Sequence, residues 1–136
     1  MLSEQLATDL RDAGLRWRPS KGDWFVIPGK GLDDLVFVLS DMVIETRRMA
    51  MGRQMLTFNG STEWALDTLA ASEALWLPRE DQLRTVLGEA FMSLEYLPGE
   101  TPGYAVAMLL GDREERFIDV DVESAYARAA LALLRG

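Results

Sequence analysis

Acidic residues recur at every second position near the C-terminus, at Asp119, Asp121 and Glu123. On a β-strand, alternate side chains point to the same face, so the three carboxylates would lie together. Carboxylate oxygens are hard ligands that bind divalent cations such as Mg²⁺ and Ca²⁺. The same residues are also typical of a solvated strand face that runs into a helix capped by Asp121. We favour this second interpretation and expect no bound metal, with a divalent-cation site as the alternative.

Two further acids have surroundings that suit acid–base catalysis. Glu63 stands beside Trp64, and Glu80 follows Pro78 and precedes Asp81. An apolar neighbour raises the pKa of a carboxyl group toward neutrality. Both acids also fall in the first turn of a predicted helix, where the helix dipole stabilises a negative charge. Glu63 and Glu80 are therefore the candidate catalytic residues, and helix stabilisation is the simpler interpretation of each.

The chain contains no histidine and no cysteine. Without imidazole it cannot supply a Ser–His–Asp triad or a histidine metal ligand. Without a thiolate it cannot form disulfides, zinc ribbons, iron–sulfur centres or a cysteine nucleophile. The Gly29–Gly31 segment is also not a Walker A loop, because Trp24 stands where that motif requires glycine. We expect no cofactor, and any catalysis would use carboxylate, Lys, Tyr, Ser/Thr or Arg side chains.

A basic segment rich in methionine lies in the N-terminal half. Arg47, Arg48 and Arg53 accompany Met49 and Met51, and no acidic residue occurs between positions 46 and 55. Flexible methionines beside arginines suit an adaptable contact surface. We interpret the segment as a hairpin tip that pairs with the acidic half of a second copy to form a homodimer. A solvated hairpin with core methionines explains the same residues.

Tryptophan supplies a second kind of candidate contact. The chain has four tryptophans, at Trp17, Trp24, Trp64 and Trp76, which is many for its length. Tryptophan covers a large apolar area and is over-represented at the energetic centres of interfaces. Most of the four are expected in the core, and Trp64 and Trp76 are the candidates for a binding surface.

The net charge of −8 is unevenly distributed. Acidic and basic residues balance in residues 1–60, so the whole excess lies in residues 61–136. Nucleic acids and anionic membranes are bound mainly by cationic side chains, and we expect neither as a partner of this acidic protein. The first residues lack the pattern of a secretory signal, and no apolar run reaches the length of a membrane span. These features predict a cytoplasmic protein.

Length and hydrophobic pattern predict one α+β domain over residues 1–136, with a mainly antiparallel sheet, short flanking helices, and helices at both ends. The predicted helices cover residues 3–13, a short segment that includes Trp64 and Leu69, and residues 79–87 and 123–135. The predicted strands cover residues 15–18, 24–28, 35–39, 42–46, 55–58, 74–77, 91–97, 104–110 and 116–120.

Two parts of the chain resemble known groups of proteins. The segments Phe58–Asp67 and Ala74–Leu83 resemble a family of small uncharacterised bacterial proteins, and the similarity extends upstream through Trp24–Pro28 and Val38–Met42. Members are sometimes labelled pilus-assembly proteins of the CpaE type, a label that implies a Walker-type ATPase. The segment from Tyr104 to Leu131 resembles phage-associated α–β–α sandwich domains that end in an alanine-rich helix. Neither resemblance implies catalytic residues at positions of this chain.

Together these patterns predict a binding or protein-interaction module without a catalytic motif. The alternative function is a carboxylate-based enzyme or a divalent-metal-binding protein, in which Glu63, Glu80 or the Asp119–Glu123 series carries the chemistry.

Overall fold

The computed structural model describes residues 1–29, 35–39, 45–48, 54–57, 68–70 and 73–136. The chain divides into two compact units. The terminal unit consists of Met1–Arg16 and Pro78–Gly136, and the central unit is Trp17–Leu77. Helices stand at both ends of the chain and every strand pairing is antiparallel among these residues, so the predicted α+β class is confirmed. The prediction that residues 1–136 form one domain stays a prediction.

Three α-helices belong to the terminal unit: α1 (Glu4–Asp12), α2 (Glu80–Leu87) and α3 (Val122–Arg135). The Ser3 hydroxyl caps α1 by accepting the backbone N–H of Leu6, and the Asp121 carboxylate caps α3 by accepting that of Ser124. Helix α2 ends at Gly88, whose φ of 54° lies in the region that favours glycine, and the short 3₁₀ turn η2 (Gly88–Ala90) follows. The helices predicted at residues 3–13, 79–87 and 123–135 are thus confirmed.

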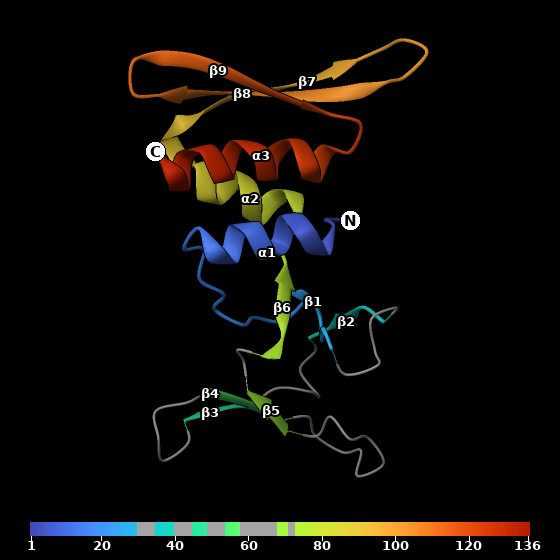
Figure 1. The fold of residues 1–136 in the computed structure, drawn as a ribbon, viewed down its shortest axis with the longest axis vertical. Coiled ribbons are helices and arrows are strands. Elements are labelled where there is room, and N and C mark those ends of the chain that lie inside the picture. Colours follow the sequence, from blue (N-terminus) through green and yellow to red (C-terminus); the bar gives the residue numbers. More distant parts are fainter. Residues whose placement is uncertain (30–34, 40–44, 49–53, 58–67, 71–72) are drawn as a thin grey trace. The chain divides into compact units, whose positions relative to one another are not determined.

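The sheet of the terminal unit contains β7 (Phe91–Leu97), β8 (Gly103–Leu110) and β9 (Arg113–Asp119) in that spatial order. Helix α3 lies along one face of this sheet, and α1 and α2 pack against α3 (Figure 1). The hairpin of β7 and β8 follows the predicted alternation. Strand β9 begins three residues earlier than predicted, because the register continues from Leu110 opposite Arg113.

Small residues allow α3 to approach the sheet closely. Ala125, Ala129 and Ala130 of α3 are fully buried, as are Val106 and Met108 of the central strand β8. The aromatic side chain of Tyr126 is buried on the same helix and stacks on Phe91 with ring centroids 5.9 Å apart. The resulting core follows the alanine-rich stripe that the sequence predicts for this helix.

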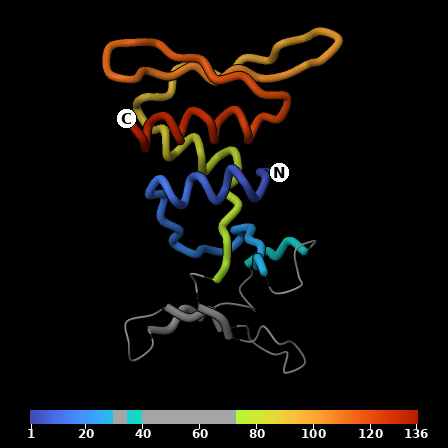
Figure 2. Tube along the Cα trace, in the orientation of Figure 1, coloured from blue at the N-terminus to red at the C-terminus, as the bar shows by residue number. Residues whose placement is uncertain are grey.

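The central unit contains two three-stranded antiparallel sheets, and the first, formed within residues 24–38 and 75–77, can be followed along the chain in Figure 2. The first has the order β2-β1-β6, and the second has the order β3-β4-β5. The strands are β1 (Trp24–Val26), β2 (Phe37–Val38), β3 (Glu45–Arg48), β4 (Gln54–Thr57), β5 (Thr68–Ala70) and β6 (Leu75–Leu77).

Aromatic rings cross the first of these sheets. Phe37, Phe25 and Trp76 are paired side by side on adjacent strands, so their side chains share one face. Trp17 lies on that face, stacked on Trp76 at 6.5 Å and tilted against Phe25 at 5.5 Å. Phe25 is fully buried, which makes this row the centre of the unit's core.

Two predicted elements of the central unit are wrong. Leu15–Arg18 forms no strand, because the Trp17 indole N–H donates to Asp23 Oδ2 at 2.9 Å and curls the segment back as a loop. The helix predicted to reach Leu69 is replaced at its end by β5, in which Leu69 pairs with Leu56 of β4. The first part of that helix lies outside the described residues.

Within the described part of the chain, no helix has both the length and the apolar character needed to span a membrane.

We predict that Asp23→Ala destabilises the central unit. Asp23 is 2% exposed, and its Oδ2 accepts from the Trp17 side chain and from the Ser20 backbone N–H, each at 2.9 Å. Both bonds are part-buried and go to a carboxylate, so their loss should cost about 1–3 kcal/mol. All four tryptophans lie in residues 17–77, so tryptophan fluorescence during urea unfolding monitors this unit.

Asp23→Asn is the matched control, because its amide oxygen can still accept one of the two bonds. Equal unfolding midpoints for the Ala and Asn variants would show that these bonds contribute nothing to stability.

Candidate functional site

The two edges of the sheet in the terminal unit differ sharply in chemistry. Strand β9, with the sequence REERFID, has five charged residues among its seven. Strand β7, with the sequence FMSLEYL, has one, Glu95. Within the described residues, each of these strands pairs on one side, with β8. Charged side chains on an edge strand discourage pairing with another chain, so β9 is protected and β7 is open.

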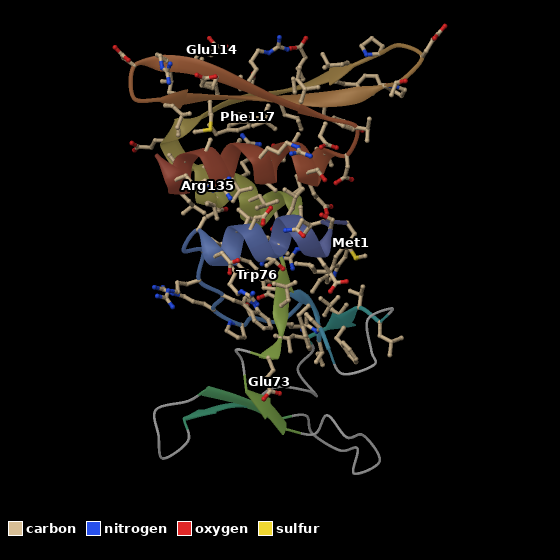
Figure 3. The ribbon with its side chains drawn as sticks, in the orientation of Figure 1. Met1, Glu73, Trp76, Glu114, Phe117 and Arg135 are labelled. Carbon is tan, nitrogen blue, oxygen red and sulfur yellow. The ribbon has the colours of Figure 1, made fainter. Side chains whose placement is uncertain are left out.

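Strand β7 exposes large apolar side chains as well as a free edge. Met92, Leu94 and Tyr96 are 45%, 38% and 57% exposed. Leu94 is paired with Val106, and Val106 is paired with Phe117, so all three side chains lie on one face. Figure 3 shows Phe117 between the sheet and α3, which identifies this as the helix-covered face. Leu94 thus belongs to the inner face and is nevertheless exposed.

The width of a single helix explains this exposure. Helix α3 packs mainly on β8 and β9, and its ring contact with β7 is made at Phe91, the first residue of that strand. A helix is roughly 10 Å wide and neighbouring strands lie about 4.8 Å apart, so one helix covers about two strands. Beyond Phe91, the inner face of β7 extends past the helix. We call Met92, Leu94 and Tyr96 the β7 patch.

Two features hold the β7 patch in place. The pairing of β7 with β8 shifts register between Phe91 and Ser93, which is the geometry of a β-bulge. The bulge lets Phe91 turn onto Tyr126 while the residues after it continue regularly. Farther along the strand, the Tyr96 ring rests against Tyr104 of β8 with centroids 5.6 Å apart. The patch is therefore built on a paired strand and not on a loop.

An ion pair crosses the outer face of the sheet. Arg116 Nη2 of β9 lies 2.9 Å from Glu95 Oε2 of β7. These residues are paired with Ala107 and Ala105 of β8, so the ion pair crosses the central strand above two buried alanines. The single charge of β7 is thereby compensated within the sheet. Glu114, labelled in Figure 3, also lies on this outer face, away from α3.

A shallow open pocket of about 480 Å³ lies at the far end of the outer face, lined by Leu97, Thr101, Gly103, Ile118, Asp119 and Val120. Its floor is formed at Gly103, where an added Cβ would stand 2.9 Å from the Asp119 carbonyl oxygen. The lining has apolar side chains and no cluster of polar groups, so it suits an apolar side chain better than a polar substrate.

The alternating acids Asp119, Asp121 and Glu123 stabilise the turn between β9 and α3. Asp119 Oδ1 accepts the Asp121 backbone N–H at 3.1 Å, and its Oδ2 accepts Arg128 Nε at 2.9 Å. Asp121 caps α3, as expected for the helix-cap interpretation. Glu123 Oε2 lies 3.3 Å from the amino group of Met1, an ion pair without hydrogen-bond geometry. In the part of the chain that is described, no three His, Cys, Asp or Glu residues form a group that could hold a metal ion.

Two pKa shifts follow from these surroundings. Burial alone would raise the pKa of Asp119, but its bond from the Asp121 N–H and its pairing with Arg128 outweigh burial and lower that pKa below 3.8. Burial raises the pKa of the Tyr126 hydroxyl above 10.0, and the Glu80 carboxylate adds to the rise. Neither shift brings a group to neutral pH, where general acid–base catalysis would need it.

The other predicted site residues that the structure describes belong to separate elements. Glu80 lies in the first turn of α2, as the dipole interpretation expects. Trp76 belongs to the aromatic row of the central unit, and its Nε1 is buried without a hydrogen-bond partner among the described residues. The backbone of Arg47 and Arg48 lies in β3. Outside the described residues are Met49, Met51, Arg53, Glu63 and Trp64.

The β7 patch was missed at the level of sequence. The sequence predicts a strand over residues 91–97 but not that Met92, Leu94 and Tyr96 are exposed. The available signal was the contrast between this strand, with one charge, and the strand beginning at Arg113, with five.

Comparisons with protein-family models, with curated proteins and with solved structures found no match.

We predict that Asp119→Asn destabilises the protein at pH 7 by about 1 kcal/mol, because Arg128 is half exposed and its pair with Asp119 is partly screened. A carboxyl group whose pKa falls on folding stabilises the fold above its ordinary pKa. That contribution is lost as the pH drops through the lowered value. The difference between the variant and the unaltered protein should therefore be full at pH 7 and shrink as the pH falls below 3.8 through the lowered pKa.

Urea unfolding followed by circular dichroism at several pH values measures this difference. Asp112→Asn, in the exposed turn between β8 and β9, is the control for a general loss of negative charge. A constant difference between pH 7 and pH 3 would contradict the role given to the Asp119 carboxylate.

Proposed function

We propose that this chain is a protein-interaction module and that the edge of β7 is its contact strand. The observation that supports the proposal is the combination of an unpaired strand edge and the exposed β7 patch, opposite an edge protected by charge. An extended segment that adds to such an edge gains main-chain hydrogen bonds, and alternate side chains give the contact its specificity. The cytoplasmic location predicted from the sequence is part of this proposal.

The chemistry of the β7 patch also favours a protein partner. Tyrosine and methionine are enriched in protein interfaces, while charged residues are depleted at the interface core. Tyr96 and Met92 fit this composition, and the Arg116–Glu95 pair leaves no uncompensated charge on the strand. Burial of the three exposed side chains would supply the hydrophobic part of the affinity.

The rival function, a carboxylate-based enzyme or divalent-metal-binding protein, stays a prediction. Asp119, Asp121 and Glu123 each interact with another group of the chain. A cation at these carboxylates would have to displace those interactions, which weighs against this alternative. The family resemblance of the N-terminal two thirds likewise stays a prediction.

Photo-cross-linking in living cells tests the contact strand. We expect p-benzoylphenylalanine in place of Tyr96 to form adducts with protein, because its ring would lie inside the interface. Ile118 of β9 is the matched control, since its side chain is 56% exposed against 57% for Tyr96 and lies on the protected edge.

Adducts at position 96 and not at position 118 support the proposal. Equal labelling of both positions, or labelling at 118 alone, would indicate that the partner contacts the outer face of the sheet. Absence of adducts at both positions would overturn the proposal.

The hairpin tip predicted from the sequence is a separate candidate contact. If Arg47, Arg48 and Arg53 form a homodimer interface, Arg48→Glu should convert a dimer to monomers, because a charge is reversed within the contact. Light scattering at matched concentrations measures the mass. An unchanged dimer mass would count against the tip and leave β7 as the remaining candidate.

A further inference from the structure

Resting on the proposed function, we infer that the partner of β7 is the β7 strand of a second copy, paired antiparallel about a two-fold axis through Leu94. The strand can be tested for self-pairing residue by residue, because its length, bulge and charge are known. The pairing would join two three-stranded sheets into one continuous sheet.

Symmetry restricts the possible registers. A two-fold axis perpendicular to the sheet leaves each face on its own side, and directly opposite residues share a face. A residue of β7 can therefore lie opposite itself or opposite a residue an even number of positions away. Five residues of the strand are exposed, and Met92 is the bulge residue, so the possible centres are Ser93, Leu94, Glu95 and Tyr96.

Three of these centres are unfavourable. Centring on Glu95 would put two carboxylates directly opposite each other, which is destabilising. Centring on Tyr96 would place Pro98, which lacks an N–H, opposite Leu94 of the other copy. Centring on Ser93 would place Glu95 opposite Phe91, whose ring is turned onto Tyr126 on the far side of the bulge.

The Leu94 centre gives compatible pairs over the exposed residues and leaves Phe91, beyond the bulge, outside the pairing. Leu94 lies opposite Leu94 of the second copy, Met92 opposite Tyr96, and Ser93 opposite Glu95. The three members of the β7 patch are thereby paired with one another on one face. The two Glu95 side chains become diagonal neighbours, and each is already held by its own Arg116 at 2.9 Å. No like charges meet directly, and the pairing runs from the bulge residue Met92 to Tyr96.

The absence of cysteine from the chain allows a direct test. In the proposed register, Leu94→Cys places two thiols on directly opposite residues, whose Cα atoms lie about 4.5–5.5 Å apart. Disulfides form at Cα separations of about 4.4–6.8 Å. We expect mild oxidation of the purified full chain to give a covalent dimer on a non-reducing gel, at least about tenfold faster than Ile118→Cys, because paired thiols react at a high effective concentration.

Glu95→Cys tests the register. In the proposed pairing the two residues at position 95 are diagonal neighbours about 7–8 Å apart, which is too far for a disulfide. We therefore expect slow cross-linking at 95. Faster cross-linking at 95 than at 94 would overturn the Leu94 axis, and equal rates at 94 and 118 would overturn self-pairing.

The unaltered chain supplies a second measurement that does not depend on a variant. Self-pairing should slow amide hydrogen exchange at residues 92–96 as protein concentration rises, with unchanged exchange in β9. Exchange in β7 that is independent of concentration, together with a monomer mass by light scattering, would overturn the inference.

Different results would overturn the β7 contact strand and its self-pairing. If Leu94→Cys stays monomeric while the cross-linker at Tyr96 captures a protein of another mass, self-pairing is wrong and the contact strand remains. If the cross-linker also captures nothing, both proposals are wrong.

Discussion

The packing of α3 on two of the three strands is the constraint on which the rest of the terminal unit depends. Buried alanines at positions 125, 129 and 130 bring the helix close to Val106 and Met108 of β8. Helices α1 and α2 then pack on α3 and add a layer behind it (Figure 1). A sheet with three strands and one covering helix must leave part of one strand uncovered. The sequence of β7 determines what is exposed there.

The composition of the uncovered part of β7 makes it a candidate contact. Proteins protect exposed edges with charges, bulges and short strands. Strand β9 has charges, while β7 has a bulge at one end only, before five regularly placed residues. An exposed apolar edge of this kind promotes aggregation unless a partner covers it. Self-pairing in a closed two-fold arrangement would cover the β7 edge of both copies at once.

The sequence predicts local structure well where pattern and packing agree. The hairpin of residues 91–110 and the alanine-rich C-terminal helix have clear periodicities, and both are confirmed. Leu15–Arg18 also alternates, but a side-chain bond from Trp17 to Asp23, six residues farther on, overrides that pattern. Leu69 likewise enters a strand through its pairing with Leu56, which local propensity does not reveal.

The candidate site could be predicted less well than the fold, for a physical reason. Alternation shows that Leu94 and Tyr96 share a face, but whether a helix covers that face depends on the lateral position of α3. That position depends in turn on the acids first considered for catalysis. Asp119 ties the end of β9 to Arg128 of α3, and Asp121 starts the helix immediately after the strand. These carboxylates hold α3 over β8 and β9, so the residues that resemble a catalytic or metal-binding group help to leave β7 free for a partner.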